Sequence, residues 1–161
     1  MFVDFNELPK NAQVWIYQSS RKFKEDEMMK IKERLTSFVD DWKDHGKKVT
    51  GSFLVKHQQF IIIALDNNER NVPGCVTDAS IRALREIERV FEVDLLNKFN
   101  TAYRENGSIN TVKLIEFQQL VKEDKITIDT IVFNGMISSK QDFETLWEVP
   151  ANQSWHQRYF N

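Results

Sequence analysis

Residues 59–91, QFIIIALDNNERNVPGCVTDASIRALREIERVF, are the stretch of sequence that decides the fold. They open with the apolar run Phe60–Leu65, which is short and rich in β-branched residues and therefore predicts a buried strand. A polar loop follows, and then comes Cys75, the one cysteine of the chain. The apolar spacing of the last part predicts a helix over residues 78–91 with Thr77 as its N-cap.

Cys75 is the sharpest chemical feature of this stretch. Val76 and Ile81 have the spacing of a hydrophobic staple around a cap at Thr77. This reading places the thiol about one turn outside a helix N-terminus, where the helix dipole favours a thiolate.

Length and composition set the broad class. The chain has 161 residues, of which 41% are hydrophobic and 29% are charged, with a net charge of −2. These values predict one globular domain, or one with a small appendage, and argue against nucleic-acid binding or a polybasic membrane anchor. One cysteine excludes an internal disulfide, and no signal peptide or membrane-spanning run is evident, so we expect a cytoplasmic protein.

The first two thirds of the chain predict the order strand, helix, strand, strand, helix. A further strand near residues 101–104 would complete the split βαβ order of a ferredoxin-like sandwich. The expected fold class is therefore α+β, with a ferredoxin-like domain at 1–100 and a small α+β extension at 101–161, possibly as one continuous domain. The elements expected in the first domain are strands 14–17, 49–56 and 59–65 and helices 24–44 and 78–91, with Gly46 ending the first helix.

The extension is expected to contain a hairpin, a helix, a strand and a last helix. Asn106-Gly107 is the strongest turn signal and predicts a two-residue type I′ hairpin. A helix at 114–123 and a strand at 126–133 follow, and Ser138 or Ser139 should cap the last helix.

Topology predicts which candidate residues lie near one another. Loops 44–48 and 66–75 should meet at one edge of the sheet, whereas His57, at a hairpin tip, should lie at the opposite edge, roughly 20 Å away. His45 could therefore approach Cys75, and His57 should not.

The candidate catalytic residues are Cys75, His45 and Asp78. A thiol beside a histidine, with Asp44, Asp66 or Asp78 as the orienting carboxylate, would make an activated nucleophile. The alternative is a buried cysteine that packs the strand-to-helix corner, with the aspartates serving as turn and cap residues.

Ligand binding is a second possibility. Its candidates are Asp66 and Thr77, near the same edge, and Arg21, from a polar loop before a helix that could hold an anion. A solvated loop is the alternative for Arg21. The three histidines are scattered and only one thiol is present, so no metal site and no cofactor are expected.

The C-terminal aromatic segment is the candidate partner-binding element. Trp155, Arg158 and Tyr159 belong to the residue types that dominate interface hot spots. The alternative is a tail that folds back over its own core.

Several segments carry a resemblance to a known family: 14–19 (VWIYQS), 74–78 (GCVTD), 126–134 (ITIDTIVFN), 147–150 (WEVP) and 154–156 (SWH). Over nearly its full length the chain resembles a small bacterial family of uncharacterised proteins that are often labelled "ABC transporter ATPase". We expect no ATPase activity, because Ser52-Phe53 stands where a phosphate-binding loop needs lysine and a hydroxyl residue.

A second resemblance is local. Residues 116–136, EFQQLVKEDKITIDTIVFNGM, are similar to the helix–strand portion of GYF-like adaptor domains. Such domains commonly bind proline-rich peptides on aromatic surfaces, so the resemblance implies a peptide-binding extension.

The sequence thus favours a non-catalytic module that binds an unknown protein partner or a small ligand. The alternative from another class is a cysteine-dependent enzyme that uses Cys75 and His45.

Overall fold

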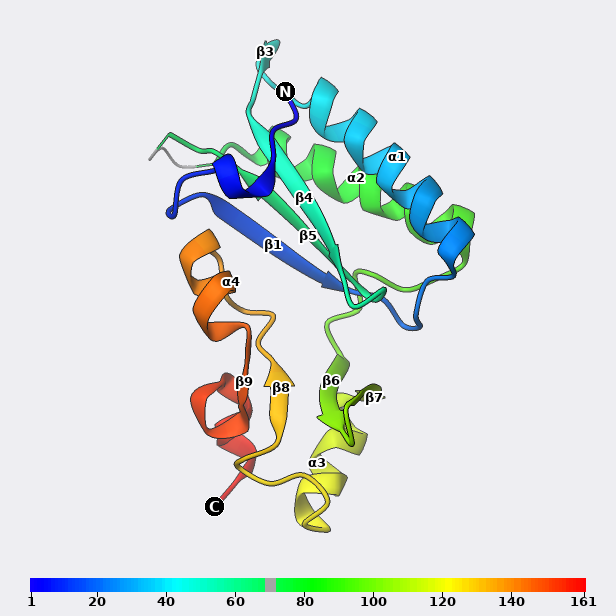
Figure 1. Ribbon diagram of the computed structural model, residues 1–161, viewed down its shortest axis with the longest axis vertical. Helices are drawn as coiled ribbons and strands as arrows, with labels where there is room; N and C mark the ends of the chain where they lie inside the picture. The colour runs from blue at the N-terminus through cyan, green and yellow to red at the C-terminus, as the bar shows by residue number, and fades with distance from the viewer. Residues whose placement is uncertain (69–71) are drawn as a thin grey trace.

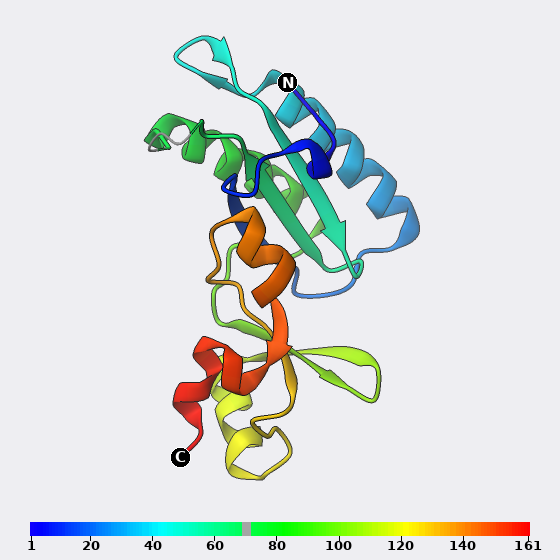
Figure 2. The ribbon, with the colours of Figure 1, turned by 60° about the vertical axis from the view of Figure 1, so that its left-hand side comes forward.

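The computed structural model describes residues 1–68 and 72–161, and its fold is α+β as predicted (Figure 1). Two main sheets lie at different positions along the longest axis, one toward each chain terminus (Figures 1 and 2). Within the described part of the chain, no helix is long and apolar enough to cross a membrane.

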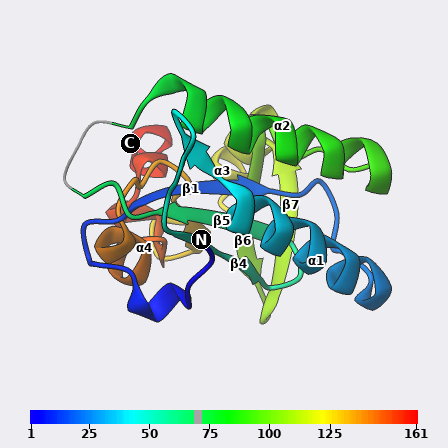
Figure 3. The same ribbon diagram turned by 90° about the horizontal axis from the view of Figure 1, so that it is seen from above.

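The sheet nearer the N-terminus has the strand order β1-β5-β4, with antiparallel neighbours. Its strands are β1 (Gln13–Gln18), β4 (Gly51–Lys56) and β5 (Phe60–Leu65). Helices α1 (Glu25–Asp41) and α2 (Gly74–Phe91) lie together on one side of this sheet (Figure 3). A short 3-10 helix, η1 (Phe5–Glu7), and α4 (Lys140–Leu146) pack against the other side.

The central strand β5 explains these layers, because its residues alternate between the two faces. Ile61 and Ile63 pack under α1 and α2, whereas Phe60 and Ile62 pack with the side chains of η1 and α4. All six residues of β5 are buried, which confirms the predicted buried strand.

The fourth strand predicted for this sheet belongs to a different sheet, so the predicted placement of residues 101–104 is wrong. These residues lie in β6 (Asn100–Glu105), which pairs with β7 and β8 rather than with β1. The second sheet has the order β7-β6-β8-β9 and contains β7 (Ser108–Lys113), β8 (Ile131–Phe133) and β9 (Glu148–Pro150). Helix α3 (Leu114–Lys122) packs on it, and two 3-10 helices, η2 (Ala151–Gln153) and η3 (Trp155–Tyr159), end the chain.

His57 lies at the turn between β4 and β5, where the two sheets meet. Its ring stacks on Trp147 with 5.8 Å between centroids, and its Nε2 lies 3.1 Å from Glu148. Arg104 of β6 also binds Glu148, at 2.9 Å. His57 is thus part of the junction between the sheets, far from the corner that contains Cys75.

Two turn predictions have opposite outcomes. Asn106 and Gly107 both have positive φ between β6 and β7, which confirms the two-residue hairpin. Gly46 does not end α1, because the helix stops at Asp41 and Trp42 follows as its C-cap. Gly46 instead forms, with His45, the turn of a small hairpin between β2 (Lys43–Asp44) and β3 (Lys47–Lys48).

Candidate functional site

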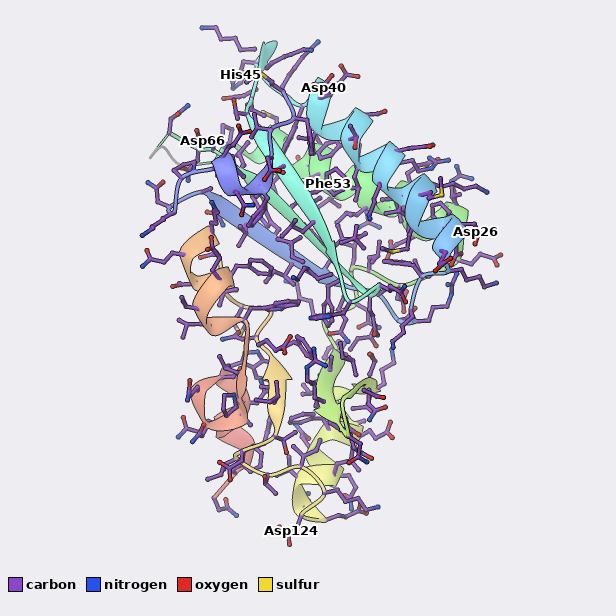
Figure 4. All side chains as sticks on the ribbon, viewed as in Figure 1. Asp26, Asp40, His45, Phe53, Asp66 and Asp124 are labelled. Atoms are coloured by element: carbon purple, nitrogen blue, oxygen red, sulfur yellow. The ribbon has the colours of Figure 1, made fainter. Side chains whose placement is uncertain are left out.

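The corner that contains Cys75 is built from the β2–β3 hairpin and the first turn of α2. His45 and Gly46 have φ of 49° and 81°, as a two-residue hairpin turn requires. His45 lies at the tip of this hairpin, at the opposite end of the molecule from Asp124 (Figure 4). The hairpin turn places the imidazole in the hollow that Cys75 of α2 also lines.

Trp42 is the buried residue that connects the β2–β3 hairpin to α2. Its indole Nε1 donates a hydrogen bond of 3.0 Å to the carbonyl of Val76, next to Cys75 in sequence. Its ring packs against Trp15 and Phe38, with centroids 6.2 and 4.9 Å away. A Cβ at Gly51 would lie 3.2 Å from the Trp42 ring, so the strand passes close beneath it. Trp42 thus holds the β2–β3 hairpin against the first turn of α2.

The predicted cap of α2 is wrong, and this changes the environment of the thiol. The helix begins at Gly74 with Pro73 as its N-cap, so Cys75 and Thr77 both lie inside its first turn. Val76 and Ile81 accordingly do not staple a cap at Thr77. Cys75 is exposed, which is opposite to the buried packing residue that the structural alternative required.

The structure brings Cys75, His45 and Asp44 together. Cys75 Sγ donates to Asp44 Oδ1 at 3.7 Å, and His45 Nε2 lies 3.5 Å from the same oxygen. One potential ligand atom from each residue lies within 4.8 Å of the others. The topological prediction that His45 approaches Cys75 is therefore confirmed, and Asp44 is the carboxylate that contacts both.

The other two carboxylates considered at this corner lie outside that group. Asp78 is exposed on α2. Asp66 accepts a hydrogen bond from the backbone nitrogen of Asn68 at 3.0 Å, in the described part of loop 66–75, of which residues 69–71 lie outside the description. Asp78 as a catalytic residue and Asp66 as a ligand contact stay predictions, because no contact among the described residues supports either role.

The remaining predicted ligand contacts, Thr77 and Arg21, make hydrogen bonds to other residues of the chain. The carbonyl of Thr77 accepts the hydroxyl of Ser80 at 2.7 Å. Arg21 makes a bidentate pair with Glu27 at 2.8 and 2.9 Å and also donates to the Phe91 carbonyl. These hydrogen bonds from Arg21 lower the pKa of Glu27 to about 2. Arg21 therefore joins its loop to α1 and α2, and these bonds favour a structural role for it.

A shallow groove runs between α1 and α2, and we call it the α1–α2 groove. It consists of two hollows of about 750 and 790 Å³ that share Ser37 and Ala83. The first contains Arg34, Glu86 and Phe91, and the second contains Cys75 and His45. Sequence reasoning missed the first hollow, although the exposed positions of two amphipathic helices were a usable signal for it.

The C-terminal aromatic segment folds back on the second sheet. Tyr159 packs against Phe117 with ring centroids 6.4 Å apart, and Trp155 stacks on the buried His156 at 3.8 Å. The Arg158 guanidinium lies 5.5 Å from the Trp155 ring. These contacts favour the alternative in which Trp155, Arg158 and Tyr159 cover their own core.

Comparison with known proteins adds no family to this description. No protein-family model, curated protein or solved structure matches the chain. Function must therefore be inferred from the geometry of the groove and of the Cys75 corner.

Proposed function

We propose that the protein is a non-catalytic binding module whose α1–α2 groove receives a segment of a protein partner. The observation that carries this proposal is the open surface around Arg34 and Val90, which are both exposed. The Arg34 guanidinium lies 6.0 Å from the ring centroid of the buried Phe91, and the arginine pairs only loosely with Glu86, at 4.0 Å. Arginine is one of the residue types that are enriched at the hot spots of protein interfaces.

The shape of the groove favours a protein segment over a small molecule. Small-molecule sites are concave and enclose most of the ligand surface. Here the rim residues Lys30, Glu33, Ser37 and Val90 are exposed, and the two hollows continue into one another along the helices. An elongated partner with an apolar stripe and charges of both signs would match this surface.

The fold of the two halves belongs to the same proposal. We assign residues 1–100 to a ferredoxin-like sandwich without its last strand, on the basis of the order β1-β5-β4. Residues 101–161 would form a second unit related to GYF-like domains, supported by their sequence similarity at 116–136. Membership of the bacterial family with the "ABC transporter ATPase" label, and a cytoplasmic location, are proposed from the sequence alone.

A cysteine-dependent enzyme is the second candidate, because exposed Cys75 shares a hollow with His45. A general base must reach the thiol whose proton it removes. In this cluster the imidazole and the thiol each contact Asp44 Oδ1, at 3.5 and 3.7 Å, and no hydrogen bond joins the thiol to the imidazole among the described residues. The lack of this hydrogen bond supports the binding module over the enzyme.

Site-specific photo-crosslinking in cells tests the binding module. Ser37 is exposed and lies in both hollows, so a photoreactive amino acid at this position should capture the partner as one discrete adduct. The matched control is Ile115, whose exposure is 78% and which lies on α3 of the other half. No adduct from position 37, or the same adducts from both positions, would contradict the proposal.

A further inference from the structure

We propose that Asp44, His45 and Cys75 form a zinc-binding site, independently of whether the α1–α2 groove binds a partner. Thiolate, imidazole and carboxylate are the three donor types that proteins use for Zn²⁺. The site differs from the expectation drawn from the sequence, in which scattered histidines and one thiol excluded a metal.

The spacing of the donor atoms matches tetrahedral zinc. With zinc–ligand distances of 2.0–2.3 Å, two ligand atoms of a tetrahedron lie roughly 3.3 to 3.6 Å apart. Cys75 Sγ lies 3.7 Å from Asp44 Oδ1, and His45 Nε2 lies 3.5 Å from the same oxygen. The third pair lies within 4.8 Å. The His45 side chain is 84% exposed, so rotation of its ring can close the remaining gap.

The backbone already presents these three donors from two fixed elements. Asp44 and His45 lie in the β2–β3 hairpin, whereas Cys75 lies in the first turn of α2. Trp42, which precedes the hairpin, holds the two elements together through its bond to Val76. Zinc would therefore join parts of the chain that are already in contact, and little ordering is needed on binding.

Charge and protons balance without any redox step. Cys75 would lose its thiol proton to solvent as the S–Zn bond forms, while Asp44 binds as the carboxylate and His45 as the neutral imidazole. The charges of thiolate and carboxylate then cancel the two charges of the ion. Asp41, Lys43 and Arg82 line the same hollow and add a net charge of +1. Three protein ligands leave the fourth position to water or to a group from a partner.

Cobalt substitution of the full chain tests the site. Co²⁺ should bind with one ion per chain and give a near-ultraviolet thiolate-to-metal band, which added Zn²⁺ abolishes by displacement. Cys75→Ser should remove the band, and His45→Gln and Asp44→Asn should each weaken zinc binding by at least about tenfold. His57→Gln is the matched control and should bind zinc like the parent chain, because His57 lies at the sheet junction.

These variants keep the test interpretable because Cys75 and His45 are exposed, so their replacement should leave the fold intact. Circular dichroism and the unfolding midpoint of the metal-free variants check this point. Absence of one-to-one binding in the parent chain would overturn the proposal. Binding that survives in both Cys75→Ser and His45→Gln would also overturn it, by placing the metal elsewhere.

Discussion

Replacing Trp42 with alanine should lower the free energy of unfolding by about 3 to 5 kcal/mol, as expected for loss of a large buried aromatic side chain. Trp42 is only 2% exposed and packs between α1, β1 and α2. The change leaves a cavity against Gly51 and removes the donor to the Val76 carbonyl. Denaturant unfolding followed by circular dichroism measures the loss.

The matched control is Trp42→Phe, which keeps an aromatic ring but lacks the indole N–H. We expect it to cost about 1 to 2 kcal/mol, because it loses one hydrogen bond and part of the packing. Equal losses for the two variants would mean that the hydrogen bond to Val76, rather than the ring volume, holds the corner. A loss below 1 kcal/mol in Trp42→Ala would contradict the packing described here.

The protein should lose about 2 to 3 kcal/mol of stability between pH 7.5 and pH 4.5 because of His156. Burial lowers the pKa of His156 from 6.5 to about 4, and the positive charge of Arg158 acts in the same direction. The folded state therefore disfavours the proton that the unfolded state accepts. The contribution is complete above pH 6.5, decreases as the pH falls below 6.5, and is largely lost near pH 4.

The contacts of the two ring nitrogens explain why the folded state disfavours a second proton on the His156 ring. Nδ1 of His156 pairs with the Ser154 hydroxyl at 2.7 Å, whereas Nε2 is buried with no hydrogen-bond partner among the described residues. A proton on Nε2 would have no acceptor.

Comparison of unfolding free energies at the two pH values isolates the effect of His156. In His156→Asn the loss between pH 7.5 and 4.5 should shrink by roughly 2 kcal/mol relative to the parent chain. His57→Asn removes a histidine at the sheet junction and should not reproduce this reduction. If His156→Asn loses as much stability in acid as the parent, the buried imidazole is not the acid-sensitive group.

Local sequence patterns predicted the three strands of the first sheet and the meeting of His45 with Cys75. The run Phe60–Leu65 is apolar at every position, and this pattern is expected for a strand that is covered on both faces. The order strand, helix, strand, strand, helix then determines at which edge of the sheet each strand ends. Loop 44–48 must then lie beside the start of α2, and the structure has it there.

The errors arose where local signals compete with distant contacts. Thr77 is a better N-cap than Pro73 by side chain, yet α2 begins earlier, with the Pro73 carbonyl accepting from the backbone nitrogen of Val76 at 3.1 Å. Gly46 can end a helix or occupy a type I′ turn with equal ease, because both need positive φ. Neither residue carries the information that decides between these roles.

The placement of β6 depends on residues far away in the sequence. Tyr103 pairs with Val132, some thirty positions later, and nothing within 101–104 distinguishes this partner from β1. The sequence did not reveal the α1–α2 groove for a similar reason. Its two sides, Arg34 and Phe91, come from different helices and meet only after packing.

The most direct test of the proposed binding function is the native mass of the protein after mild lysis of cells that express it. The parent chain should elute in a complex heavier than its monomer mass of 19.1 kDa. Ser37→Arg, which places a long charged side chain where the two hollows meet, should shift it to the monomer, whereas the control Ile115→Arg should not. A monomeric parent chain, or a complex unaffected by Ser37→Arg, would contradict binding through the α1–α2 groove.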